Sequence, residues 1–315
     1  MTKPTLLALA GLDGENMVAL EERFNVVKLY NESNPEAKLN EVKDDVRGII
    51  ATMRNTVREN LISACPNLEI ITLISVGYDN VDLECAKARN IIVTNTPDVV
   101  TNDTADTAMG LLLNTSRRYV EGDAFVRTGQ WMSGKKKPVG RTLHGKKVGI
   151  YGLGRIGKVI ARRCAAFDMH ISYYGRHNQP DVDYTYYDDL IQMAFDVDYL
   201  ILSCPGGERT HHSVNKDVFA ALGPDGYVIN VARGSVVDEV ALVEALHNKV
   251  IAGAGLDVFE NEPNVPEELK TLDNVALLPH MGAATHETFD IMDGIVLENL
   301  LLHFDGKPVS TPVTY

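Results

Sequence analysis

An arginine, a glutamate and a histidine each follow a short apolar run in the second half of the chain, as Arg233, Glu262 and His280. The three runs span residues 227–231, 252–256 and 275–278. Arginine offers a rigid fork of donors that suits a carboxylate, and histidine exchanges a proton near neutral pH. A carboxylate beside the histidine orients its ring and favours its protonated form. Each residue alone equally fits a structural role, but together they fit the reduction of a 2-keto acid by a hydride donor.

A glycine-rich turn at residues 152–157, Gly-Leu-Gly-Arg-Ile-Gly, lies between an apolar run and a helical pattern. This strand, turn and helix order is the context that a dinucleotide-binding fingerprint requires. Gly152 would make the turn, Gly154 would let the backbone approach a pyrophosphate, and Gly157 would let the helix pack on the strand. The alternative is an ordinary glycine turn between two packed elements.

The composition limits the classes of protein to consider. The chain has 315 residues, enough for two domains, and a formal net charge of −13, which disfavours nucleic acid or an anionic membrane as partner. No apolar run is long enough to span a bilayer, and the N-terminus reads as a strand and not as a signal peptide. Four cysteines, Cys65, Cys85, Cys164 and Cys204, lack metal or redox spacing, so we expect reduced thiols in a cytoplasmic protein and no metal site.

The elements that must position these residues alternate between strand and helix. In the first hundred residues, strands are predicted at Thr5–Ala10, Phe24–Leu29, Arg47–Thr52, Ile70–Ser75 and Ile91–Asn95, and helices include Asn55–Ala64 and Asp82–Arg89. A second series has six predicted strands, at Val148–Tyr151, His170–Tyr174, Tyr199–Ser203, Tyr227–Val231, Ala252–Asp257 and Val275–Leu278, and its helices include Arg155–Phe167 and Asp238–His247. Such alternation predicts α/β domains with doubly wound parallel sheets.

One long helix, from about Asn102 to Arg127 and capped by Asn102 or Asp103, is predicted between the two series. Its apolar residues Ala105, Met109, Leu112 and Leu113 keep helical spacing. A last helix, Ala283–Phe304, returns the chain to the first series. We therefore expect a substrate domain at residues 1–98 and 286–315, and a dinucleotide-binding domain inserted at 99–285, with a cleft between them.

With these motifs in this order, the chain resembles the D-isomer-specific 2-hydroxyacid dehydrogenase family. The matching stretches are residues 152–157, 229–242, 253–263 and 277–285, with SVGYDNVD at 75–82. The resemblance implies a Rossmann coenzyme domain inserted into a flavodoxin-like substrate domain. It implies Arg233 as substrate anchor, His280 as acid/base and Glu262 as its partner, and a homodimer built on the helix at about 102–127. It also implies that the amides of Val76 and Gly77 hold the substrate carboxylate.

The cofactor-binding residues expected on this basis include Asp257, which would contact the nicotinamide carboxamide. The full set is Gly152, Gly154, Arg155, Ile156, Gly157, Gly175, Arg176, His177, Asn178, Cys204, Pro205, Thr210, Val231, Ala232, Arg233, Asp257, His280 and Gly282. The acid that would bond the ribose 2′-OH is missing: Gly175 occupies its place and Arg176 follows. Glycine leaves room for a 2′-phosphate and arginine supplies charge, which favours NADPH, with NADH as the alternative. Arg176 could instead face solvent or stack on adenine.

The substrate is less well defined by the sequence. The compact length and the predicted NADPH preference resemble the glyoxylate/hydroxypyruvate reductase branch, and predict reduction to a D-2-hydroxy acid. Arg54, at the end of a predicted strand, reads equally as a substrate contact or a surface residue. The alternatives are a larger 2-keto acid, of 2-ketogluconate or aromatic pyruvate type, a formate-type dehydrogenase, and a non-enzymatic nucleotide sensor.

Overall fold

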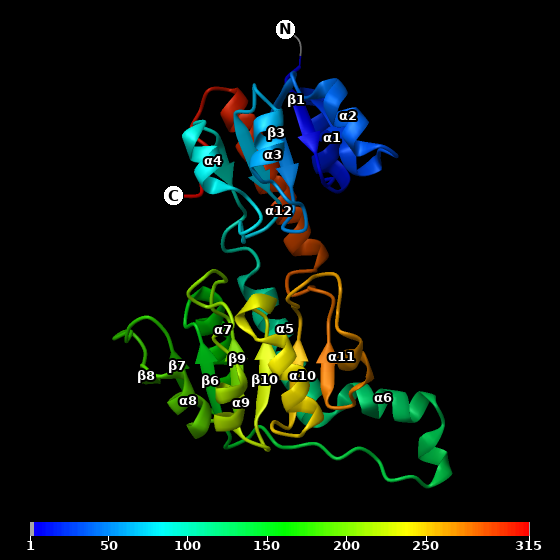
Figure 1. Ribbon diagram of the computed structural model, residues 1–315, viewed down its shortest axis with the longest axis vertical. Helices are drawn as coiled ribbons and strands as arrows, with labels where there is room; N and C mark the ends of the chain where they lie inside the picture. The colour runs from blue at the N-terminus through cyan, green and yellow to red at the C-terminus, as the bar shows by residue number, and fades with distance from the viewer. Residues whose placement is uncertain (1–2, 315) are drawn as a thin grey trace. The chain divides into compact units, whose positions relative to one another are not determined.

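The computed structural model describes residues 3–314, which divide into two compact units (Figure 1). The first contains the described residues up to Val100 together with those from Ala284 onward, and the second is Thr101–Ala283. Each unit contains one parallel sheet with helices on its faces, so the predicted fold class, two doubly wound α/β domains, is confirmed. Among the described residues, no helix combines the length and the apolar character needed to cross a membrane.

The sheet of the first unit has five parallel strands in the order β2-β1-β3-β4-β5. This is the flavodoxin-like order. The strands are β1 (Thr5–Ala8), β2 (Asn25–Lys28), β3 (Val46–Ala51), β4 (Ile70–Leu73) and β5 (Ile92–Thr94). All four residues of β1 and of β4 are buried, as expected for parallel strands covered on both faces.

The helices of the first unit are mostly short, apart from one long C-terminal helix. They are α1 (Gly14–Arg23), α2 (Pro35–Val42), α3 (Glu59–Ala64), α4 (Leu83–Ala88) and α12 (His286–Phe304), with a 3-10 turn, η1 (Leu29–Asn31). The prediction that a helix begins at Asn55 is wrong, because Val57 forms a parallel bridge with Val81 and keeps this stretch extended. On α12, Val296 and Leu300 pack on the sheet beside α1.

The sheet of the second unit has seven parallel strands in the order β12-β11-β10-β9-β6-β7-β8, which is a doubly wound order. Its strands are β6 (Lys147–Tyr151), β7 (His170–Tyr174), β8 (Thr185–Tyr187), β9 (Tyr199–Leu202), β10 (Tyr227–Asn230), β11 (Gly253–Leu256) and β12 (Val275–Leu277). The sequence pattern does not predict β8. It is a three-residue edge strand within an acidic stretch, and it pairs only with β7.

Helices cover both faces of this second sheet (Figure 1). They are α5 (Thr101–Arg117), α6 (Tyr119–Arg127), α7 (Arg155–Ala166), α8 (Leu190–Asp196), α9 (Lys216–Leu222), α10 (Glu239–His247) and α11 (Glu267–Thr271), with 3-10 turns η2 (Gln130–Ser133) and η3 (Gly234–Val236). One core joins α5 and α7 to the sheet, with Ala105, Leu112 and Ile160 fully buried. The other joins α8, α9 and α10, with Met193, Phe219 and Leu246 among its members.

The single long helix predicted from Asn102 to Arg127 is wrong, because Arg118 adopts a left-handed conformation (φ 56°, ψ 41°) and divides it into α5 and α6. The Ser116 carbonyl, which in a continuous helix would accept from residue 120, accepts from the Arg141 N–H of the returning chain at 2.6 Å. Since α5 begins at Thr101, Asn102 and Asp103 lie inside its first turn and are not its caps.

Candidate active site

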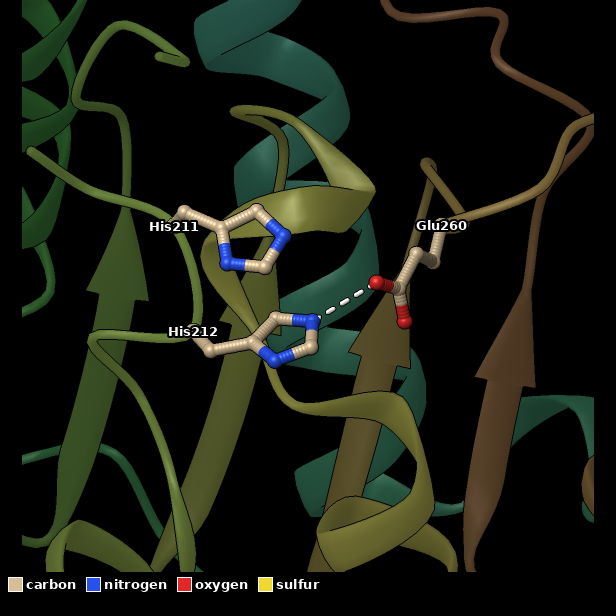
Figure 2. Close-up of side chains that lie close together, drawn as sticks. All are labelled: His211, His212 and Glu260. Carbon is tan, nitrogen blue, oxygen red and sulfur yellow. Dashed lines mark hydrogen bonds and ion pairs between the residues drawn. The ribbon is translucent and has the colours of Figure 1, made fainter. Parts of the chain in front are cut away.

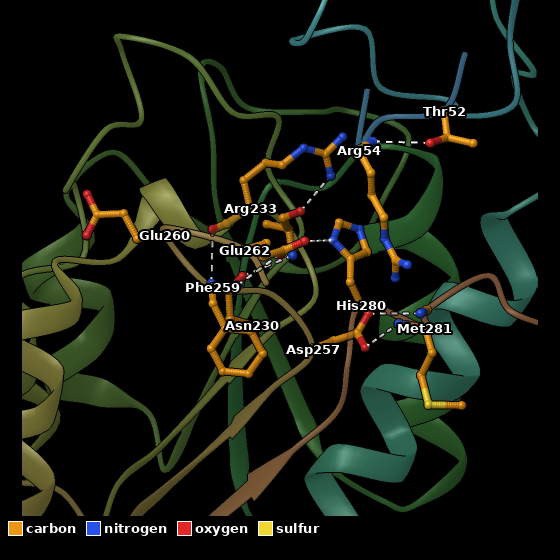
Figure 3. A network of polar contacts seen from close by, with 12 residues as sticks. Thr52, Arg54, Asn230, Arg233, Asp257, Phe259, Glu260, Glu262, His280 and Met281 are labelled. Carbon is orange, nitrogen blue, oxygen red and sulfur yellow. Dashed lines mark hydrogen bonds and ion pairs between the residues drawn. The ribbon is translucent and has the colours of Figure 1, made fainter. Parts of the chain in front are cut away.

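The loops after β10, β11 and β12 bring Arg233, Glu262 and His280 to one edge of the second sheet. These strands are neighbours in register, with Asn230 opposite Leu256 and Leu256 opposite Leu277, so their carboxyl ends align. His280 Nδ1 and Glu262 Oε2 lie 2.6 Å apart (Figure 3). Their side chains are only 18% and 27% exposed, so water weakens this ion pair less than it would on an open surface.

The Glu262 carboxylate is held in its ionised form. Burial raises its pKa, but the hydrogen bond and charge of His280, the Phe259 N–H and the charge of Arg233 together bring the pKa below its usual value. The Phe259 N–H donates to Glu262 Oε1 at 3.1 Å. Because an ionised carboxylate only accepts hydrogen bonds, Nδ1 of His280 must be the donor in this pair, and Nε2 is the nitrogen left to exchange a proton with a ligand.

Asp257 fixes the loop that carries His280. Its Oδ1 accepts from the Met281 N–H and its Oδ2 from the Gly282 N–H, both at 2.8 Å (Figure 3). Asp257 is 2% exposed, and burial raises the pKa of its carboxyl despite these amides and the nearby His280 charge. His280 itself has a positive φ of 54°, a strained conformation for a histidine that this clamp stabilises. The sequence motifs indicate only a cofactor contact for Asp257, and this positioning role has no signal in the sequence.

Arg233 lies on extended backbone immediately before η3, and the Asn230 side chain braces this turn. Asn230 Oδ1 accepts from the Ala232 N–H, and its amide donates to the Arg233 carbonyl, both at 3.0 Å. Arg233 Nη1 donates to the Ala232 carbonyl at 2.7 Å. A Cβ on Gly234 would lie 1.9 Å from the Phe259 carbonyl carbon, so only glycine fits between this turn and the segment that leads to Glu262.

In the glycine turn after β6, Gly152 and Gly157 are tightly packed and Gly154 faces open space. Gly152 has a φ of +96°, and a Cβ there would lie 2.6 Å from Cys204 Cα. A Cβ on Gly157 would lie 2.1 Å from the Gly152 carbonyl oxygen, whereas one on Gly154 would meet nothing within 4 Å. The turn therefore leaves Gly154 open at the start of α7, where Arg155 and Ile156 form the first turn. This geometry fits a pyrophosphate against the helix N-terminus.

The segment after β7 has the space and charge expected for a 2′-phosphate. A Cβ on Gly175 would meet nothing within 4 Å, and Arg176 and His177 are exposed. Asn178 is exposed too, but its Oδ1 accepts from the Tyr173 hydroxyl at 2.8 Å, which orders the segment. The space at Gly175 and the exposed charge of Arg176 are compatible with either nicotinamide dinucleotide.

The loop after β9 contains three further predicted cofactor residues. Cys204 is buried, and burial raises the pKa of its thiol to about 12, so the thiol is neutral and unreactive. The Thr210 hydroxyl donates to the Pro205 carbonyl at 2.8 Å and shapes the loop from within. On the neighbouring loops, Val231, Ala232 and Gly282 are buried, so they can offer backbone or small contacts but no charged group.

The predicted substrate contacts Val76, Gly77 and Arg54 belong to the first unit. Asn95 donates to the Val76 carbonyl and the Ser75 hydroxyl to the Gly77 carbonyl, both at 2.7 Å, which fixes the turn after β4. Within residues 3–314, the amides of Val76 and Gly77 have no hydrogen-bond acceptor, so both suit a bound carboxylate. Arg54 is exposed after β3, and its N–H donates to the Thr52 hydroxyl at 3.3 Å.

A doubly wound sheet with an open glycine turn and a histidine–glutamate pair at its carboxyl edge defines a dinucleotide-dependent oxidoreductase. Residues 109–282 match the family model described as D-isomer specific 2-hydroxyacid dehydrogenase, NAD binding domain. The chain belongs to the D-isomer-specific 2-hydroxyacid dehydrogenase family, as its motifs predicted.

Individual relatives support this assignment over nearly the whole chain. Over 294 residues it is 45% identical to glyoxylate/hydroxypyruvate reductase A HPR2 of Arabidopsis thaliana, covering 93% of this chain and 94% of that one. It is equally similar, with the same coverage, to hydroxyphenylpyruvate reductase of Plectranthus scutellarioides. Among solved structures, the NADPH-dependent glyoxylate/hydroxypyruvate reductase of Sinorhizobium meliloti, in complex with NADP and malonate, is 44% identical with a TM-score of 0.90, covering 99% of this chain and 97% of that one.

Proposed function

We propose that this protein is an NADPH-preferring reductase that converts small 2-keto acids, glyoxylate and hydroxypyruvate, to D-2-hydroxy acids. The observation that carries the proposal is the 2.6 Å His280–Glu262 pair, next to Arg233 on the unit that matches the NAD-binding family model. A partly buried acid/base pair argues against a non-enzymatic nucleotide sensor, and Glu262 as the histidine's partner favours a hydroxyacid dehydrogenase over a formate-type enzyme.

Each side chain then has a defined task. The guanidinium of Arg233 binds the substrate carboxylate and draws electron density from the keto oxygen. His280, charged and oriented by Glu262, donates the proton from Nε2 to that oxygen. On the first unit, we assign the amides of Val76 and Gly77 to a substrate carboxylate and Arg54 to the distal part of the substrate. When bound, the reduced nicotinamide supplies the hydride for C2.

The two units divide these tasks. We assign the first to the substrate, because it provides the open amides after β4, and the second to the cofactor. Gly152, Gly154, Arg155, Ile156 and Gly157 would hold the pyrophosphate. Gly175, Arg176, His177 and Asn178 would hold the 2′-phosphorylated ribose, and Asp257 would meet the nicotinamide carboxamide. The NADP complex of the Sinorhizobium meliloti relative supports the NADPH preference.

A larger 2-keto acid is the second candidate for the substrate. The hydroxyphenylpyruvate reductase of Plectranthus scutellarioides is as similar to this chain as the glyoxylate/hydroxypyruvate reductase of Arabidopsis thaliana, 45% in each case. Overall similarity therefore favours neither size of substrate, and the proposal of a small substrate depends on the solved Sinorhizobium meliloti relative, a glyoxylate/hydroxypyruvate reductase.

The deciding experiment is kcat/KM for glyoxylate, hydroxypyruvate, 2-ketogluconate and hydroxyphenylpyruvate, each measured with NADPH and with NADH. We expect the highest value for a two- or three-carbon acid with NADPH. A preference for NADH would keep the chemistry and contradict the role of Arg176, whereas turnover of only the larger acids would replace the substrate. No turnover with any pair would contradict the enzymatic assignment.

Two further features of the proposal concern the protein in its cell. We propose a homodimer, because exposed apolar side chains gather on α6 and the segment that follows it, including Val120, Val126, Trp131 and Met132. We also propose a cytoplasmic location, since the four cysteines are free thiols.

A further inference from the structure

A second histidine–carboxylate cluster lies outside the acid/base pair, on the loop after β9 and on the segment after β11. His212 Nε2 and Glu260 Oε1 are 2.6 Å apart, and the ring of His211 stacks on that of His212 with centroids 3.9 Å apart (Figure 2). One ligand atom from each of the three residues lies within 4.8 Å of the other two. None of the three has a role in the proposed reaction.

The backbone around this cluster is fixed in place. His212 has a positive φ of 48°, and its N–H donates to the Ser235 carbonyl at 2.8 Å. The N–H of His211 donates to the Gly207 carbonyl at 3.0 Å. On the other side, the Glu260 N–H donates to Glu239 Oε1 at 3.2 Å. Two loops 48 residues apart in sequence therefore present their ligand atoms from ordered positions.

We propose that His211, His212 and Glu260 form a binding site for a borderline divalent transition-metal ion of the zinc class. Two imidazoles and one carboxylate are a donor set that suits Zn²⁺ and its neighbours and is poor for Mg²⁺ or Ca²⁺. Three protein ligands leave a fourth position for water, as in open zinc sites.

The geometry needs only small adjustments to accept the ion. Zinc bonds of about 2.0–2.1 Å place tetrahedral ligand atoms about 3.3 Å apart, so the His212–Glu260 contact must open slightly. The His211 ring must turn, and this is open to it because the residue is exposed. The side chains of His212 and Glu260 are 35% and 34% exposed, which gives the ion a path from solvent.

Charge at the cluster also favours a cation. Glu239 Oε1 accepts from the Glu260 N–H at 3.2 Å, so a second carboxylate that repels the Glu260 charge lies beside it. A divalent ion on Glu260 would relieve this repulsion. Because Glu260 is two residues from Glu262, the ion would join the loop after β9 to the segment that carries the partner of His280.

The test is a calorimetric Zn²⁺ titration of the tag-free, full-length protein without nucleotide, paired with Co²⁺ absorption spectra that report coordination by nitrogen and oxygen. We expect one equivalent to bind in the wild type, and His211→Ala and Glu260→Gln each to weaken it at least about tenfold. His144→Ala is the matched control, because His144 faces Asp168 at 3.2 Å on the surface with no third ligand within residues 3–314. This control should bind like the wild type.

A second control separates the cluster from the acid/base pair, which is itself a histidine beside a carboxylate. His280→Gln should abolish turnover and leave the Zn²⁺ isotherm unchanged. Loss of the Zn²⁺ equivalent in His280→Gln, its retention in His211→Ala and Glu260→Gln, or no binding by the wild type at millimolar Zn²⁺ would each overturn the proposal.

Discussion

At the scale of single residues, the proposed chemistry depends on His280 as the proton donor. We predict that His280→Ala lowers kcat by at least about 10²-fold, the lower end of general acid–base contributions. His247→Ala, which removes an exposed histidine of the same unit, should leave kcat unchanged. The measurement is steady-state reduction of hydroxypyruvate at saturating NADPH. A variant that keeps near-wild-type kcat would eliminate His280 as the acid.

The position of Arg176 makes a second prediction at this scale. Arg176→Ser should lower kcat/KM for NADPH at least about tenfold and leave the value for NADH nearly unchanged, because only NADPH carries the 2′-phosphate that this exposed cation would meet. Arg162→Ser, on the exposed face of α7, is the matched control for lost positive charge. Equal losses with both cofactors would indicate that Arg176 stacks on the adenine or supports the loop.

The sequence predicted the three side chains of the proposed reaction but not the residues that hold their loops in place. Arg233, Glu262 and His280 were predictable because each follows a strand, and parallel strands bring their carboxyl ends to one edge. The Asp257 clamp on Met281 and Gly282 joins a side chain to the backbone of a loop 24 and 25 residues away, so no local pattern signals it. The same holds for the His212–Glu260 pair, 48 residues apart.

At the scale of elements, two substitutions in the glycine turn test its role in packing and its role in cofactor binding separately. Gly157→Ala should lower the free energy of unfolding by about 1–3 kcal/mol, because its Cβ would lie 2.1 Å from the Gly152 carbonyl oxygen. Gly154→Ala should keep stability within about 1 kcal/mol, since its Cβ meets nothing within 4 Å, and should weaken NADPH binding. Denaturant unfolding without cofactor and fluorescence titration of NADPH measure the two effects. Equal stability losses would contradict the packing argument.

The contact between α12 and the start of α1 depends on a buried acid. Asp293 is 3% exposed and accepts from the Asp13 N–H at 2.6 Å, and burial raises the pKa of its carboxyl to about 6. The folded protein therefore holds this proton more tightly than the unfolded chain. The stabilisation from the protonated form is fully present below pH 4 and is lost as pH rises through about 6.

We accordingly predict that Asp293→Asn has a free energy of unfolding about 1–3 kcal/mol higher than the wild type at pH 7.5, and therefore a higher unfolding temperature. This difference should shrink toward pH 4. The neutral amide oxygen can still accept from the Asp13 N–H. Asp290→Asn, on an exposed turn of the same helix, is the control and should stay within about 0.5 kcal/mol of the wild type. A destabilised Asp293→Asn at pH 7.5 would show that the charge itself is needed.

Most elements were predictable from alternating apolar runs and glycine turns, and the failures at Arg118 and at β8 have physical causes. The break at Arg118 follows from the returning chain, whose Arg141 N–H donates to the Ser116 carbonyl, and the nearby Gly122 does not mark it because it lies inside α6. Strand β8 depends on pairing with β7, because three residues in an acidic stretch have too little apolar pattern of their own.

At the scale of the whole molecule, the proposed homodimer would explain why the second unit has exposed apolar side chains. The segment formed by α6 and η2 extends away from its sheet (Figure 1), and Val126, Trp131 and Met132 on it are 55%, 69% and 95% exposed. Surfaces of this kind are typical of association sites when their apolar residues are contiguous. A second copy of the chain would cover them.

We predict that the wild type has twice its chain mass of 34.6 kDa in solution, and that the double variant Trp131→Glu and Met132→Glu has the mass of one chain. Two carboxylates would have to be buried without partners in the interface, which opposes association. Phe195→Glu is the matched control, because Phe195 is 72% exposed on α8, away from this segment. Light scattering after size-exclusion chromatography measures the mass at several concentrations. A monomeric wild type would remove the dimer from the proposal, and an unchanged dimer in the double variant would place its interface on another face.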